Sequence, residues 1–225
     1  MLKKVAIAIL LTVVLIGLAL WSPWYGWNLN IYNIFGIENV DKLSGIKIKS
    51  LSGEIEIYID GQFEGSVTDN EDFADISSLK PGNHSVKLVK KSNTDYYVFE
   101  RNILFEAGVE AIIAYDLGPN EKFTEGHIFY AKKNYANEGK PQLTIYSNPD
   151  LTKVFVDDVF LGETPLRNID IDLNSQHKIK LQKIGFDDLE FTILPEDIES
   201  RNKLQGFDLI LEAKLFLKPI QIVTQ

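Results

Sequence analysis

Short segments in which apolar and polar residues alternate follow one another from residue 46 onward. Residues 46–50 alternate isoleucine with lysine, residues 55–59 alternate isoleucine with glutamate and tyrosine, and residues 85–90 continue the pattern. Turn residues such as Asp60-Gly61 separate these segments. Alternation with a period of two, interrupted by turn residues, is typical of antiparallel strands joined by hairpins. No long stretch after residue 45 has the 3.6-residue period of an amphipathic helix, so we expect an all-β fold.

The alternation also assigns side chains to faces, because successive residues of a strand point to opposite sides of a sheet. The residues expected in the core are Ile57, Ile59, Val86, Leu88, Val154, Val156, Ile179 and Leu181. The residues expected on the opposite face are Lys87, Lys178, Lys180, Tyr58, Tyr146 and Phe155. Exposed aromatic rings on strands can bind sugars or partner side chains, so Tyr58, Tyr146 and Phe155 are the candidate ligand or partner surface. The alternative is that the linker or the neighbouring half covers them.

The chain also contains an internal repeat. With an offset of 97 residues, residues 46–67 align with residues 143–164. The identical positions pair Ile48, Ser50, Asp60, Phe63 and Gly65 with Ile145, Ser147, Asp157, Phe160 and Gly162. Residues 84–90 align with residues 177–183 at an offset of 93 residues. Such self-similarity predicts two copies of one unit, which we expect to be two tandem small antiparallel β-sandwich domains.

The repeat sets the expected domain boundaries. We place the first domain at residues 46–118 and the second at residues 142–225, with a spacer at residues 28–45 before them. The linker, residues 119–141, carries aromatic residues such as Phe123 and Tyr135, which a free linker rarely does. We expect part of this linker to pack on a repeat, as an extra strand near His127 to Ala131.

The first 27 residues predict a transmembrane helix. Lys3 and Lys4 precede an uncharged and mostly apolar run that extends to Trp27, somewhat longer than the roughly 20 residues that span a bilayer. The aromatic residues expected at the membrane interface are Trp21, Trp24, Tyr25 and Trp27. Positive charge on the N-terminal flank alone predicts a single-pass protein of the cytoplasmic membrane, with its N-terminus inside and the rest outside.

A cleaved signal peptide is the alternative interpretation of this segment. Gly17 and Ala19 are small residues at the spacing that signal peptidase requires, with cleavage before Leu20. The mature protein would then be secreted.

Composition excludes several classes of function. The 225 residues carry a formal net charge of -9, and such a surface repels nucleic-acid phosphate. The absence of cysteine excludes disulfides, thiolate metal sites and cysteine catalysis. The sequence also lacks a nucleophile elbow, a phosphate-binding loop and a dinucleotide fingerprint. We therefore expect a protein that is not an enzyme and binds neither a cofactor nor nucleic acid.

The histidines and acidic residues do not predict a metal site. His84 and His177 fall at equivalent positions of separate copies and His127 stands alone in the linker, so zinc-ligand spacing is missing. Residues 170–174 resemble the start of a calcium loop, but Ser175 and Leu181 stand where that loop needs glycine and glutamate. The acidic segment 69–72 is the other calcium candidate. We expect no metal at either place.

One set of motifs in the second copy resembles a known family. The motifs are Ser147-Asn148-Pro149, a strand that ends in Asp157-Asp158, Gly162-Glu163-Thr164-Pro165 and Gly185-Phe186. This pattern resembles the PEGA domain, a small extracytoplasmic β-sandwich module. The segment Pro149-Asp150-Leu151-Thr152 departs from the tetrapeptide that names the family, and Asp158 replaces a turn glycine. The first copy is more distant but keeps Asp60-Gly61 and Gly65.

The resemblance extends over residues 46–118 and 143–212, which are most of the chain beyond the predicted anchor, and implies a binding role outside the cell. We expect a membrane-anchored, non-catalytic binding or scaffolding protein of the cell envelope. Its partners would be cell-wall glycan or envelope proteins. The alternative is an interaction subunit of a larger membrane-associated secretion or surface assembly.

Overall fold

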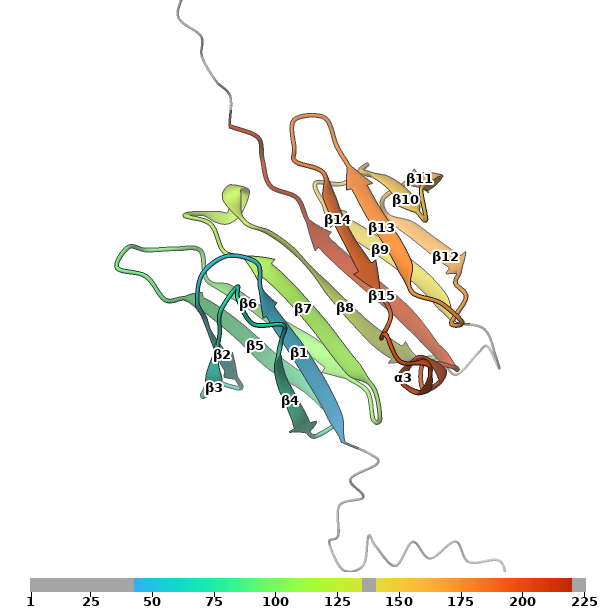
Figure 1. Cartoon of the computed structure of the whole chain (residues 1–225), viewed down its shortest axis with the longest axis horizontal. Helices are drawn as coiled ribbons and strands as arrows, with labels where there is room; N and C mark the ends of the chain where they lie inside the picture. The colour runs from blue at the N-terminus through green and yellow to red at the C-terminus, as the bar shows by residue number, and fades with distance from the viewer. Residues whose placement is uncertain (1–42, 135–140, 220–225) are drawn as a thin grey trace, which may run out of the picture. The chain divides into compact units, whose positions relative to one another are not determined.

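The computed structural model describes residues 43–134 and 141–219 (Figure 1). The predicted anchor, the four predicted interface residues (Trp21, Trp24, Tyr25 and Trp27) and nearly all of the predicted spacer lie outside the described residues. Among the described residues, no helix has the length and apolar character needed to cross a membrane. Strands dominate this part of the chain, so the prediction of an all-β fold is confirmed.

The strands fall into two similar series. The first series is β1 (Ser44–Ser50), β2 (Ile55–Ile59), β3 (Gln62–Val67), β4 (Ala74–Leu79), β5 (Gly82–Lys90), β6 (Phe99–Phe105) and β7 (Glu110–Asp116). The second series is β9 (Gln142–Asn148), β10 (Lys153–Val156), β11 (Val159–Glu163), β12 (Leu166–Asp170), β13 (His177–Gln182), β14 (Leu189–Ile193) and β15 (Phe207–Lys214). The elements outside the series are the 3-10 turn η3 (Glu121–Phe123), strand β8 (Glu125–Lys133) and the short helix α3 (Ile198–Asn202).

The two series connect their strands in the same order. Each forms a four-stranded sheet, β3-β2-β5-β6 in the first half and β11-β10-β13-β14 in the second. We call these the first and second small sheets. The other strands join one seven-stranded sheet of order β12-β9-β15-β8-β7-β1-β4, which we call the shared sheet. Within it, β1 is parallel to β7 and β9 is parallel to β15.

Strand β8 stands at the centre of the shared sheet and joins the two halves. It lies in the predicted linker, at the position where the sequence predicts an extra strand, and it pairs antiparallel with both β7 and β15. The two sandwiches are therefore not separate modules, because they have one sheet in common. The described residues accordingly belong to a single compact unit.

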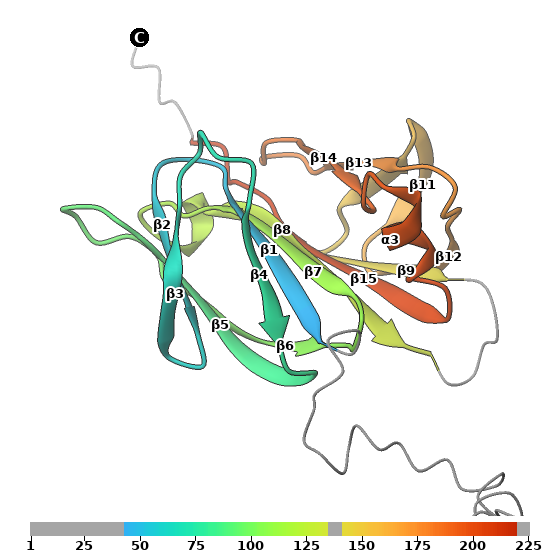
Figure 2. The ribbon, with the colours of Figure 1, turned by 60° about the horizontal axis from the view of Figure 1, so that its bottom comes forward.

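The two small sheets cover opposite faces of the shared sheet. Ile128 and Tyr130 of β8 pack in the first core, whereas Phe129 and Ala131 pack in the second. Because successive side chains of a strand point in opposite directions, the two cores lie on opposite sides of β8. In Figure 2, strands β5 and β6 lie below the shared sheet and strands β13 and β14 lie above it.

The side chains that alternation assigns to the core are buried. Ile57, Ile59, Val86, Leu88, Val154, Ile179 and Leu181 are at most 4% exposed, and Val156 is half-buried against the second core. The predicted two-residue turns are also present. Asp60 and Gly61 have φ angles of 51° and 80°, and Asp157 and Asp158 have angles of 50° and 65°. Positive φ at both central residues matches the right-handed twist of the flanking strands.

Candidate binding surfaces

An aromatic pair stands on the outer face of each small sheet. Tyr58 of β2 lies opposite Phe63 of β3, with ring centroids 5.5 Å apart. Phe155 of β10 lies opposite Phe160 of β11, with ring centroids 5.4 Å apart. The rings of Phe63 and Phe160 are more than half exposed, so these partners of the predicted residues contribute much of the accessible aromatic surface. The alternation did not select them, although both are identities of the internal repeat.

A lysine flanks each aromatic pair at the same place. Lys87 lies opposite Tyr58 across β2 and β5, and Lys180 lies opposite Phe155 across β10 and β13. The Tyr58 hydroxyl donates a hydrogen bond of 2.9 Å to Glu56, and this bond raises the pKa of Tyr58. Each surface therefore combines an aromatic platform with polar groups at its edge, an arrangement that suits sugar rings or partner side chains.

The third predicted residue lies elsewhere. Tyr146 is on β9 of the shared sheet, where it is 37% exposed, and the guanidinium of Arg167 lies 5.7 Å from its ring centroid. Tyr58, Tyr146 and Phe155 therefore stand on three different sheets. They do not form one surface.

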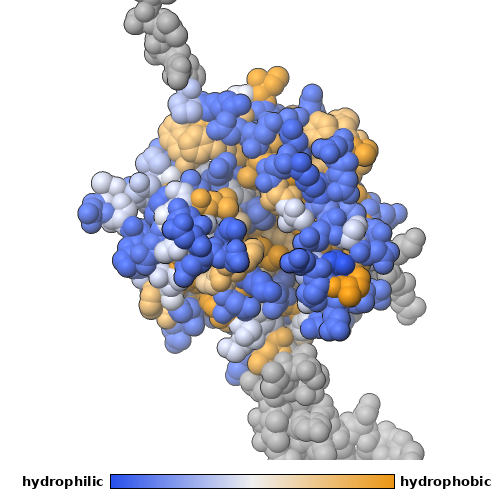
Figure 3. Space-filling model, viewed as in Figure 1, coloured by the Kyte–Doolittle hydropathy of each residue, from blue (hydrophilic) through white to orange (hydrophobic). Residues whose placement is uncertain are grey.

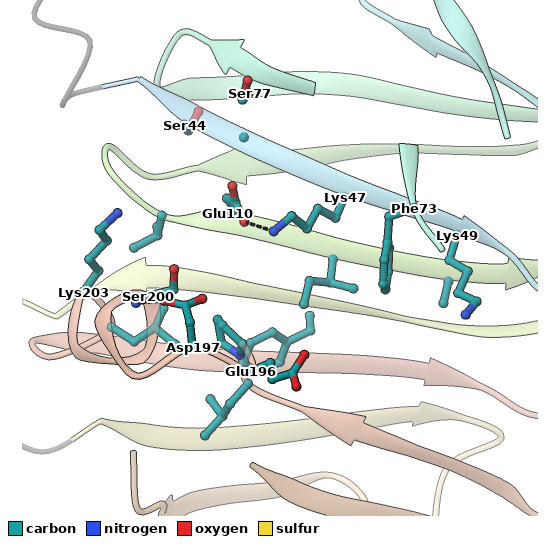
Figure 4. A pocket seen from close by; sticks show the side chains of 18 of the residues that line it. Ser44, Lys47, Lys49, Phe73, Ser77, Glu110, Glu196, Asp197, Ser200 and Lys203 are labelled. Atoms are coloured by element: carbon teal, nitrogen blue, oxygen red, sulfur yellow. Dashed lines mark hydrogen bonds and ion pairs between the residues drawn. The ribbon is translucent and has the colours of Figure 1, made fainter. Parts of the chain in front are cut away.

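A groove lies on the face of the shared sheet that carries the second small sheet (Figure 4). Its floor consists of β1, β7 and β8, and its wall consists of β14 and α3. Its volume is about 1260 Å³. Apolar side chains line the floor, among them Val109, Ile112 and Phe129. Figure 3, which shows this face, has hydrophobic surface between hydrophilic side chains in the middle of the view.

Charged side chains lie in the middle of the groove and at both of its ends. Lys47 and Glu110 form an ion pair of 2.9 Å above the floor. Lys49 lies at one end, where its ammonium is 5.5 Å from the ring centroid of Phe73. Figure 4 shows Asp197 and Lys203 at the opposite end, beside α3.

His127 of β8 connects the floor of the groove to its wall. Its ring stacks on Phe191 of β14, with centroids 3.8 Å apart and an angle of 8° between the planes. His127 is 7% exposed, and its Nδ1 has no hydrogen-bond partner in the described part of the chain. Burial lowers the pKa of His127 to about 4, so the ring is neutral at pH 7.

The corresponding contact on the other face is polar. Val86 and Ile179 are equivalent residues of the internal repeat. Arg101 of β6 pairs with Val86 and Phe191 of β14 pairs with Ile179, so Arg101 is the equivalent of Phe191. Arg101 forms an ion pair with Glu212 of β15, and Glu212 also accepts a hydrogen bond of 2.9 Å from the hydroxyl of Tyr130.

A small residue takes the place of Glu212 on the groove side. The strand register pairs Glu212 with Tyr146 in β15 and β9, and it pairs Ala114 with Lys49 in β7 and β1. Ala114 is too short to reach across to β14, and the contact at this position comes instead from its strand partner His127, which stacks on Phe191. The bridge on the groove side is therefore aromatic, whereas the bridge on the other face is ionic.

Helix α3 is fixed at its end of the groove by a buried arginine. Arg201 is 8% exposed. Its guanidinium donates hydrogen bonds to the carbonyl oxygens of Leu173, Asn174, Pro195 and Glu196. The side chain of Asp197 caps the helix by accepting a hydrogen bond of 2.7 Å from the amide of Ser200. These contacts tie the wall of the groove to the loop between β12 and β13.

The histidine and aspartate side chains that could have been metal ligands contact other protein groups. His84 contacts Asp60, and His177 contacts Asp157. In the calcium candidates, Asp69 accepts a hydrogen bond from the amide of Gly53, and Asp172 accepts one from the amide of Asn174. The residues described by the structure contain no group of three or more side chains placed to hold a metal ion.

The motifs of the second half meet in one buried hydrogen-bond network. The hydroxyls of Ser147 and Thr164 are 2.5 Å apart, and Thr164 also accepts a hydrogen bond of 3.1 Å from the amide of Thr152. Ser147 and Thr152 both donate to the carbonyl oxygen of Pro149. Ser147, two positions before Pro149, and Thr164 of the Gly-x-Thr-Pro turn are thus needed together, because each hydroxyl is a hydrogen-bond partner for the other in a buried place.

The model of the PEGA domain family matches residues 140–205. This segment is a PEGA domain. A search of curated proteins gave no significant match. The PEGA match does not include the first half, where Val67 stands in place of Thr164. The strand order of the first half is nevertheless that of the PEGA half.

Proposed function

We propose that this protein is a non-catalytic binding or scaffolding protein of the cell envelope. The observation that carries the proposal is the repeated aromatic pair, Tyr58 with Phe63 and Phe155 with Phe160, at matching positions of both small sheets. Aromatic rings on an exposed sheet face favour stacking on sugar rings or on partner side chains. Cell-wall glycan is the proposed ligand class, with an envelope protein as the alternative partner.

The first half is, on this proposal, a divergent PEGA copy. Its strand order, its Asp60-Gly61 turn and its Gly65 support that relationship. Gly65 has a φ of 148°, and the matching Gly162 has a φ of 147°, so both occupy a backbone region that side chains rarely adopt. Duplication would give the protein two glycan-binding faces, and two weak sites on one chain bind a polymer more tightly than one.

The proposed location is the outer side of the cytoplasmic membrane. Residues 1–27 supply the anchor, since they combine an apolar run with Lys3 and Lys4 on one flank. A PEGA domain is in keeping with a surface-associated role. Protease added to intact spheroplasts should degrade the protein beyond its first segment, and protection of residues 43–219 would refute the location. A mature N-terminus at Leu20 would support the secreted form instead.

Sedimentation with purified cell-wall sacculi tests the ligand class. The full chain in detergent should co-sediment, and the variant Tyr58→Ala/Phe63→Ala/Phe155→Ala/Phe160→Ala should lose at least ten-fold in affinity. Tyr146→Ala is the matched control, because it removes an exposed aromatic ring from a different sheet. If the four-fold variant bound the sacculi as tightly as the unchanged chain, the aromatic pairs would not be the glycan-binding site.

A second candidate function is that of an interaction subunit in a larger assembly. The edge strand β11 favours it, because Val159, Phe160 and Leu161 are each at least 39% exposed. The first half has polar Gln62 and Glu64 on either side of Phe63 at the matching places. An apolar edge is typical of a protein contact. Crosslinking in cells should yield a partner at fixed stoichiometry, and Val159→Gln/Leu161→Glu should abolish that crosslink.

A further inference from the structure

We infer that the groove binds an extended segment of another polypeptide, which adds as a strand beside β14. Strand β14 is the edge of the second small sheet, and in the described ranges it pairs with β13 alone. The first small sheet packs on the opposite face of β1 and β7, and of the β1 and β7 residues that line the groove only Ile112 packs against the second core. One added strand would pair with the open edge and would lie over the rest of this floor.

The size of the groove favours a polymer over a small molecule. Its volume of about 1260 Å³ exceeds the roughly 300–1,000 Å³ typical of small-molecule sites. Its lining follows β1 from Ser44 to Leu51. Strands rise about 3.3 Å per residue, so an extended segment of about seven residues matches this length.

The floor selects apolar side chains at alternate positions of that segment. Half-buried Ile112 of β7 lines the groove together with Phe129 of β8 and Val109, which are 3% and 8% exposed. In the middle of the groove, Lys47 and Glu110 neutralise each other's charge as an ion pair. Side chains that face the floor should therefore be apolar and uncharged, whereas those that face away are unrestricted.

The two ends of the groove select opposite charges. At the end formed by Phe73, the ammonium of Lys49 contacts an aromatic ring and no carboxylate within the described residues. At the α3 end, the acidic residues Glu196 and Asp197 outnumber Lys203. Charge complementarity therefore calls for a segment with an acidic residue near Lys49 and a basic residue near α3.

A second copy of this chain fits this pattern poorly. The chain carries a formal net charge of -9, so two copies repel one another at low ionic strength. The groove is also separate from the aromatic pairs, which lie on the small sheets. The inference therefore goes beyond the proposed function, and the two can be tested separately.

Fluorescence anisotropy with two labelled heptapeptides tests the inference on the full chain in nanodiscs. One peptide is Asp-Val-Thr-Val-Ser-Val-Lys, and the other has the reverse order, because the strand can add in either direction. We expect one of them to bind and the other to bind at least ten-fold more weakly. Failure of both, or equal binding of both, would overturn the inference.

Variants assign the binding to the groove. Lys49→Glu should weaken the preferred peptide at least ten-fold and should restore binding of a peptide in which lysine replaces the aspartate. Lys87→Glu makes the same charge change on the outer face of the first small sheet and should have no effect. Lys49→Gln, which keeps the length and removes only the charge, should give an intermediate loss. Equal affinity in Lys49→Glu and Lys87→Glu would contradict the groove as the site.

Hydrogen exchange reports on strand addition directly. Peptide binding should slow amide exchange in β14 and should leave β3, an edge strand of the other small sheet, unchanged. Unchanged exchange in β14 would refute strand addition even if the peptide binds. The four-fold aromatic variant should bind the peptide normally, so failure of glycan binding and failure of the groove inference give different results.

Discussion

The imidazole of His84 lies 2.6 Å from a carboxylate oxygen of Asp60 through its Nδ1 atom. Its Nε2 atom lies 2.7 Å from the carbonyl oxygen of Lys80. An ionised carboxylate and a carbonyl can only accept hydrogen bonds, so both ring nitrogens must donate and the imidazole is positively charged. The second half repeats the arrangement, with His177 between Asp157 and the carbonyl oxygen of Asp172. Each half thus uses a histidine to hold its two-residue turn against the following strand.

Asp60→Asn should lower the pKa of His84. Burial alone would lower this pKa, but the bonds to Asp60 and to the Lys80 carbonyl outweigh burial and raise it above its ordinary value. A raised pKa contributes stability that is fully present below about pH 6.5 and is lost as the pH rises through the folded-state value. Asparagine tolerates the positive φ of this turn, so the variant removes the charge and keeps the geometry. A proton NMR titration should show a lower pKa of His84 in the variant than in the unchanged chain, and an equal pKa in the two would contradict the role of Asp60.

His127→Phe should make the protein less sensitive to mild acid. The pKa of His127 is about 4 in the folded chain and about 6.5 when unfolded. Below pH 6.5 the unfolded state therefore takes up a proton that the folded state refuses, and the free energy of unfolding falls until about pH 4. The full effect is of order 3 kcal/mol. Urea unfolding at pH 7.5 and pH 4.5 should show a smaller loss in the variant, whose ring can still stack on Phe191.

Arg201→Met should destabilise the second half. Arg201 is buried and donates to four carbonyl oxygens, so its removal leaves these acceptors without their partner. We expect a loss of about 2–4 kcal/mol in the free energy of unfolding. Arg167→Met changes an exposed arginine and should cost less than about 0.5 kcal/mol. Similar losses in the two variants would show that the carbonyl contacts of Arg201 are unimportant.

Gly126→Ala should disrupt the pairing that joins the halves. Gly126 has a φ of 151°, and a Cβ atom there would overlap the carbonyl oxygen of Ala114 and the ring of Tyr115. We expect a loss of more than about 3 kcal/mol, because steric overlap adds to backbone strain. Gly61→Ala also places alanine at positive φ, but its Cβ would meet no atom within 4 Å, so it should cost only about 1 kcal/mol. Thermal unfolding of both variants gives the comparison.

Local pattern was enough to predict much of the fold. Alternation in β2, β5, β10 and β13 assigns the buried side chains correctly, because a period of two is a property of the strand itself. The turn at Asp60-Gly61 was also predictable, since it depends on neighbouring residues alone. The shared sheet was not predictable. It depends on β8 pairing with β15, whose residues follow about 80 positions later in the chain.

The groove has the same origin and was missed for the same reason. The stacking of His127 on Phe191 and the small side chain of Ala114 matter only once β7, β8 and β14 are brought together. No signal near any of these residues marks them as neighbours. The aromatic surfaces were predicted in part, since alternation selects Tyr58 and Phe155 but says nothing of which residue lies across the hairpin.

Strand β8 contributes alternate side chains to both cores, and this restricts how the chain can change in length. Ile128 and Tyr130 fill one core while Phe129 and Ala131 fill the other. The insertion or deletion of a single residue at the start of β8 would exchange these two sets, because a shift of one position turns every side chain of a strand to the opposite face. One such change would therefore mispack both sandwiches. The two halves can diverge in sequence, but the number of residues that lead into β8 must stay the same.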